Sequence, residues 1–182
     1  MSNQKRITFL KLMFLALLII IFGCASPPKT LDPSVSGPQL IVNPELIRLS
    51  VSKMKDTNIV FEGSGFKSGD SILITLTGPK ETKVIAAEAP IKPDGTFKAP
   101  VPALTKIMEF LRADITFNEK FENVVIISQP PIPKGVYTAE VGSMISKQTA
   151  ETKLNVKGPT IIDSLKDWIG KLTGKIEHKK GK

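Results

Sequence analysis

Short segments in which apolar and polar residues alternate, separated by turn residues, most constrain the fold of this chain. In residues 47–52, Ile47, Leu49 and Val51 alternate with polar side chains, which is typical of a strand with one buried face. Further strand-like segments follow with turns about every ten residues, at residues 58–63, 71–77, 83–88, 96–98, 123–128, 136–142 and 151–157. This spacing predicts a mostly β protein with an antiparallel sandwich or barrel.

The turns of this region carry a second, more specific pattern. Residues 65–72 read GFKSGDSI, residues 94–97 read DGTF and residues 133–137 read PKGVY. This ordered set resembles bacterial Ig-like envelope domains. The resemblance implies an Ig-like antiparallel β-sandwich over residues 45–157, in which the motif residues are structural and not functional. Gly69 is free to adopt a positive φ in its turn, and Phe66 is expected to fold beneath that turn into the core.

An insertion over about 103–131 departs from the strand pattern. Its apolar residues Leu104, Ile107, Met108 and Leu111 have helical spacing, which predicts a short helix over 104–112. Phe117 and Phe121 follow among charged residues. Two interpretations remain open: a crossover helix that caps one end of the sandwich, or an added surface, with Phe117 and Phe121, that binds a partner.

Residues 158–182 are predicted to form a basic amphipathic helix and tail. Thr160 and Asp163 have the spacing of a capping box at its start. One side carries Asp163, Lys166, Asp167, Lys171 and Lys175, and residues 177–182 are expected to be a frayed end. The other side is apolar, and comprises Ile161, Ile162, Leu165, Trp168, Ile169, Leu172 and Ile176.

Three roles are open for this helix. It can pack back on the sandwich. It can also dock on a protein partner or on a second copy of the chain. Gly170 and Gly174 would allow another surface to approach the helix closely. It can also lie on an anionic membrane. The candidate membrane or partner contacts are Trp168, Ile169, Leu172, Lys171 and Lys175.

The first 23 residues are typical of a secretory leader. Lys5, Arg6 and Lys11 precede eleven apolar residues at 12–22, and this run is too short to span a bilayer. Without these three basic residues, +5 of the formal net charge of +8 remains. That mild excess suits contact with anionic lipid and does not indicate a nucleic-acid partner.

Ile21, Phe22, Gly23 and Cys24 end the leader, and this sequence resembles the lipobox of bacterial lipoprotein precursors. The resemblance implies that Ile21, Phe22 and Gly23 are recognised by a signal peptidase and that Cys24 is lipidated. It also implies a cell-envelope location, with the outer membrane favoured because no aspartate follows Cys24 at the second mature position. Residues 24–44 contain five prolines and are expected to be a tether.

Few residues are suited to catalysis or metal binding. The chain has one histidine, His178, and one cysteine, Cys24, which excludes the usual zinc clusters and catalytic pairs. Asp70 and Asp94 lie in turns that could hold calcium, but they lack EF-hand spacing. Aromatic residues are too sparse for a nucleic-acid platform. We expect no enzyme activity, cofactor, metal or nucleic acid.

These observations together indicate a membrane-anchored envelope lipoprotein that acts as a non-enzymatic binding or scaffolding module. Its expected partners are the lipid bilayer, through acylated Cys24, and an envelope protein. One alternative is an accessory subunit of an envelope or secretion complex that docks through the C-terminal helix. The other is an envelope enzyme of an unfamiliar kind.

Overall fold

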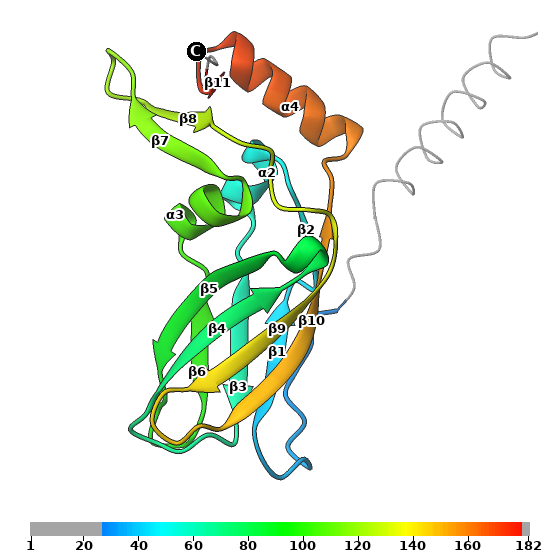
Figure 1. The fold of residues 1–182 in the computed structure, drawn as a ribbon, viewed down its shortest axis with the longest axis vertical. Coiled ribbons are helices and arrows are strands. Elements are labelled where there is room, and N and C mark those ends of the chain that lie inside the picture. Colours follow the sequence, from blue (N-terminus) through cyan, green and yellow to red (C-terminus); the bar gives the residue numbers. More distant parts are fainter. Residues whose placement is uncertain (1–26, 180–182) are drawn as a thin grey trace, which may run out of the picture.

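The computed structural model describes residues 27–179, and their fold is mostly β (Figure 1). One sheet has three antiparallel strands in the order β1-β3-β6, comprising β1 (Gln39–Asn43), β3 (Val60–Ser64) and β6 (Phe97–Pro100). A second sheet has five strands in the order β2-β10-β9-β4-β5. These are β2 (Leu46–Arg48), β10 (Thr149–Lys157), β9 (Gly135–Ser143), β4 (Ser71–Thr77) and β5 (Lys83–Pro90). The strands of this sheet pair antiparallel except β2, which runs parallel to β10.

The two sheets share one hydrophobic core and form a sandwich-like body. In β4, Ile72, Ile74 and Leu76 are fully buried and alternate with more exposed residues, so the period-two pattern identified the inner face correctly. Val42 and Phe61 enter the same core from the three-stranded sheet. The predicted mostly β fold is confirmed at this level.

A smaller third sheet and the helices lie together at one end of this body (Figure 1). The sheet has the order β11-β8-β7, with β7 (Ala113–Phe117), β8 (Asn123–Ile127) and β11 (Ile176–His178). The helices at this end are α2 (Val51–Asp56), α3 (Ala103–Thr105), the π-helical segment η2 (Lys106–Phe110) and α4 (Ile161–Leu172). A 3-10 turn, η1 (Pro79–Glu81), lies between β4 and β5.

The GFKSGDSI turn is held by side chains at both of its ends. Phe66 is buried, as expected, and its ring lies edge-on to Phe97 with the centroids 5.3 Å apart. The Asp70 carboxylate accepts hydrogen bonds from the amides of Ser71, Ile145 and Ser146. Asp70 therefore fastens this turn to the β9–β10 turn.

The structure differs from the sequence expectations in two places near the first strands. The segment expected to be a tether contains β1, and Asn43 hydrogen-bonds to the backbone of Lys29 in both directions. The predicted strand over 47–52 ends early, because Ser50 caps α2 and its hydroxyl accepts from the Lys53 amide. Val51 is thus a buried helical residue.

Two further differences lie in the insertion and at the C-terminus. The helix expected over 104–112 is present as α3 and η2, but the region around Ile115 and Phe117 is strand β7. Residues 177–179 were expected to fray, whereas β11 pairs with β8 in parallel. Ile176 belongs to that strand and not to the helix, because Gly174 adopts a positive φ just after α4.

Candidate functional site

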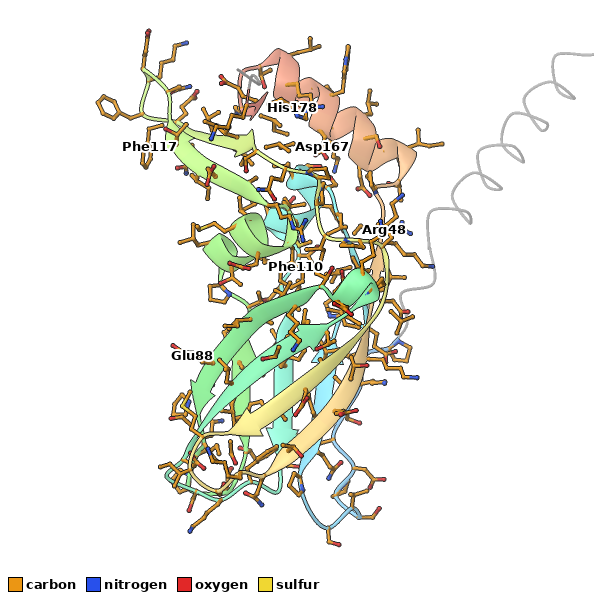
Figure 2. The ribbon with its side chains drawn as sticks, in the orientation of Figure 1. Arg48, Glu88, Phe110, Phe117, Asp167 and His178 are labelled. Carbon is orange, nitrogen blue, oxygen red and sulfur yellow. The ribbon has the colours of Figure 1, made fainter. Side chains whose placement is uncertain are left out.

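Helix α4 contacts the rest of the protein through its acidic side. The Asp167 carboxylate accepts hydrogen bonds from the Ser50 hydroxyl and from the amides of Val51 and Ser52, at 2.9–3.1 Å. These two amides are free donors at the start of α2, where a helix has no partners of its own. Figure 2 shows Asp167 on the side of α4 nearest α2.

Asp163 fixes the start of α4 itself. Its carboxylate accepts from the Thr160 amide, and the Thr160 hydroxyl accepts from the Asp163 amide, so the predicted capping box is confirmed. The pKa of Asp163 is lowered, first by the hydrogen bond with the Thr160 hydroxyl and then by the one from the Thr160 amide. The positive charges of Lys53 and Arg48 lower it further, whereas burial raises it. Asp163 is the only buried residue of α4.

Helix α2 is held at its other end by a buried lysine. The Lys106 ammonium group donates to the Thr57 carbonyl at 2.7 Å, just beyond the last turn of α2. Burial lowers the pKa of Lys106, while the nearby Asp56 carboxylate raises it. An acid at the N-terminus and a base at the C-terminus both suit the dipole of α2.

The apolar side of α4 faces solvent. Trp168 is 55% exposed and Ile161 is 89% exposed, and none of the stripe is buried. The structure therefore holds α4 against the body through Asp167 and through the close approach of Gly170 to the Ile176 side chain, and it leaves the hydrophobic surface of the helix largely exposed. We call this surface the α4 stripe, and it comprises Ile161, Ile162, Leu165, Trp168, Ile169 and Leu172.

Lysines border the α4 stripe. At about 100° per residue, Lys166 and Lys171 fall on its two edges, and Lys175 follows in the turn after the helix. All three side chains are exposed. Of the predicted contact residues, Trp168, Ile169 and Leu172 lie within the stripe, while Lys171 and Lys175 lie beside it. This arrangement is typical of helices that lie in a lipid interface.

An open groove of about 510 Å³ lies beside α4. Its apolar side chains come from α2, α3, η2, α4 and the third sheet, and its charged lining residues are Lys55, Lys166 and Lys175. We call it the α4 groove, and its main apolar residues are Val51, Ile107, Ile115, Val125, Ile169 and Ile176.

The β7–β8 hairpin presents two phenylalanines at its tip. Phe117 is 66% exposed and Phe121 is 87% exposed, and Figure 2 shows Phe117 pointing away from the body. The Asn118 side chain accepts from the amides of Lys120 and Glu122 and so orders the turn. The rings of Phe117 and Phe121 are not part of the core.

The remaining candidate residues fall into two groups. Ile21, Phe22, Gly23 and Cys24 lie outside the described residues. His178 is exposed and is the last residue of β11. Within residues 27–179, no group of three His, Cys, Asp or Glu residues is placed to hold a metal ion.

The sequence interpretation missed the Asp167 contact and the α4 groove. Ser50 before an amphipathic Val51–Asp56 segment was a readable N-cap signal, but nothing local marks Asp167 as its partner. The groove combines residues from segments far apart in the chain, and no local pattern predicts it. Among the helices of residues 27–179, none is long and apolar enough to cross a membrane.

Comparisons with known proteins add little to this description. No family model matches the chain, and no curated protein matches it. Among solved structures, macromomycin is similar with a TM-score of 0.36 and 14% identity, over 66% of this chain and 99% of that one. That level of likeness carries no argument about function.

Proposed function

We propose that the mature chain is a lipid-anchored protein of the cell envelope, with acyl chains on Cys24, and that it acts as a non-enzymatic binding or scaffolding module. An Ig-like β-sandwich would form its body, and the outer membrane is the favoured location. Its contact surface is the α4 stripe. The outward orientation of this stripe is the observation that carries the proposal.

Exposure of the α4 stripe to water is energetically unfavourable. Exposed apolar side chains gain roughly 25 cal/mol for each Å² that they bury, and here Ile161, Leu165 and Trp168 lie side by side on one helix surface. The protein body does not cover them, because α4 uses its acidic side for that contact. We therefore expect a surface outside the chain to cover the α4 stripe.

An anionic lipid leaflet fits this surface best. Trp168 has the amphipathic ring that favours the lipid–water boundary, and Lys166 and Lys171 border the stripe where phosphates would lie.

The segment between the proposed anchor at Cys24 and the folded body is short. Residues 29–43 are hydrogen-bonded into the body, so only about five residues, or less than about 20 Å, separate an anchored Cys24 from the folded part.

Trp168 is the only tryptophan, so its fluorescence reports on α4 alone. We expect its emission to shift to shorter wavelength when the full chain is mixed with phosphatidylglycerol vesicles. The double variant Ile162→Gln, Leu165→Gln should lose the shift. Ile145→Gln changes an exposed side chain in the turn between β9 and β10, away from α4, and should retain the shift. An unchanged emission in the native chain would contradict the lipid contact.

The anchor is tested separately. Mass spectrometry of the mature N-terminus should show a diacylglyceryl mass on Cys24, and Cys24→Ser should abolish it. An unmodified thiol or an intact leader would contradict the lipoprotein assignment, whatever the vesicle result.

A second candidate function is an accessory subunit of an envelope complex, and a different observation favours it. Phe117 and Phe121 are exposed at an ordered hairpin tip, and exposed aromatic rings are common anchors in protein interfaces. Cross-linking in cells should then capture one envelope protein with the native chain but not with Phe117→Ser, Phe121→Ser. If cross-linking captures the same proteins with both chains, the tip is not a docking element.

A further inference from the structure

We infer that the α4 groove binds a single acyl chain that carries an anionic head group, such as a fatty acid. This site lies on the side of α4 that faces the third sheet, and it shares only Ile169 with the α4 stripe. The inference stands whether or not Cys24 anchors the protein.

The size and chemistry of the groove fit an acyl chain. Its volume of about 510 Å³ lies within the range of small-molecule sites. Val51, Ile107 and Ile176 are buried lining residues, and Ile115 and Ile169, from β7 and α4, are partly exposed there. An alkyl chain has no polar atom that needs a partner, so it could cover the exposed parts of Ile115 and Ile169 without losing a hydrogen bond of its own.

The charge of the groove selects the head group. Its lysines come from three places, with Lys55 on α2, Lys166 on α4 and Lys175 in the turn before β11. None of the residues that line the groove is acidic. Every charged side chain in the lining is therefore positive, which favours a carboxylate or phosphate at the rim over a cationic head group.

The test titrates oleate into the full chain carrying Cys24→Ser, so that no acyl group of its own is present, after removal of bound lipid. We expect saturable binding of one oleate per chain. Ile115→Asp should weaken it about tenfold or more, because it places a carboxylate in the groove. The matched control is Ile85→Asp, an exposed isoleucine on β5 outside the groove, which should bind like the parent chain.

The contribution of the lysines is measured by a second pair of variants. Replacing Lys55, Lys166 and Lys175 by Gln should weaken oleate binding several-fold and leave oleyl alcohol binding unchanged, because the alcohol has no charge. Replacing the exposed Lys67, Lys83 and Lys153 by Gln removes the same charge elsewhere and should have no effect on oleate.

Three results would overturn the inference. They are a lack of saturable oleate binding, an equal effect of the Ile115 and Ile85 variants, or an equal effect of the two lysine sets. Circular dichroism checks that each variant is folded. If Ile115→Asp unfolds, Ile169→Asp on the opposite wall replaces it, since that side chain is also partly exposed.

Discussion

Asp167 and Ser50 join two helices that are far apart in the sequence: the Ser50 hydroxyl donates to the Asp167 carboxylate at 3.0 Å. Ser50 is the N-cap of α2, and the same carboxylate accepts from the next two amides. One acidic side chain therefore both satisfies the start of α2 and holds α4 on the body. The polar side of α4 is its structural side, which leaves the apolar side free for contact.

Replacing Asp167 by Ala should loosen α4 and destabilise the protein by about 1–3 kcal/mol. The change removes the acceptor of three hydrogen bonds, two of them from the first turn of a helix. Urea unfolding gives the loss of stability, and hydrogen exchange should rise in α4 and β11 before it rises in β4. Asp114→Ala, an exposed acid on β7, is the control and should stay within about 0.5 kcal/mol. Equal effects of the two variants would show that the Asp167 contact contributes nothing.

Asp70 should make the protein more stable above pH 4 than at pH 2. The pKa of Asp70 is lowered from 3.8 to about 2, and the largest cause is the hydrogen bond from the Ser146 amide. The Ser146 hydroxyl and the amides of Ser71 and Ile145 lower it further, whereas burial raises it. The folded chain thus binds this proton less readily than the unfolded chain. The stabilisation is complete above about pH 5 and is lost progressively as the pH falls toward 2.

The Asp70→Asn variant tests this pH dependence. Its urea midpoint should be lower at pH 7 and should fall less steeply between pH 5 and pH 2 than that of the native chain. Asp114→Asn should keep the native slope, because that side chain is exposed on β7. Parallel curves for the native chain and Asp70→Asn would contradict the role of Asp70.

Gly78 should tolerate no side chain, whereas Gly142 should tolerate one. A Cβ at Gly78 would overlap the ring of Tyr137, which is fully buried and whose hydroxyl donates to the Pro133 carbonyl at 2.9 Å. Gly78→Ala should therefore cost about 1–3 kcal/mol by overpacking. A Cβ at Gly142 meets nothing within 4 Å, so Gly142→Ala is the control. Thermal unfolding compares them, and similar melting temperatures would contradict this packing.

The strands of the body were predictable because their signal is local. Alternation places Ile72, Ile74 and Leu76 on one side of β4 whatever the rest of the chain does. The capping box of Thr160 and Asp163 was predictable for the same reason, since its two partners are three residues apart. Local patterns of this kind supplied most of the element positions.

The arrangement at the helical end was not predictable, because its determinants are long-range. The alternation of Ile47, Leu49 and Val51 runs smoothly into α2, and only the cap at Ser50, completed by Asp167 from a distant helix, ends the strand. Periodicity also identified the apolar side of α4. It did not reveal that the acidic side makes the contact, since a hydrophobic stripe normally faces the core.

The hairpin tip should be dispensable for folding. Phe117 and Phe121 are largely exposed, whereas Phe110 in η2 is fully buried. Each Ser variant at the tip should change the free energy of unfolding by about 0.5 kcal/mol or less, while Phe110→Ser should cost at least about 3 kcal/mol. Urea unfolding of the three variants makes the comparison, and a tip variant as costly as Phe110→Ser would place those rings in the core. Stable folding without the rings would mean that they are free to serve a contact outside the chain, as the second candidate function requires.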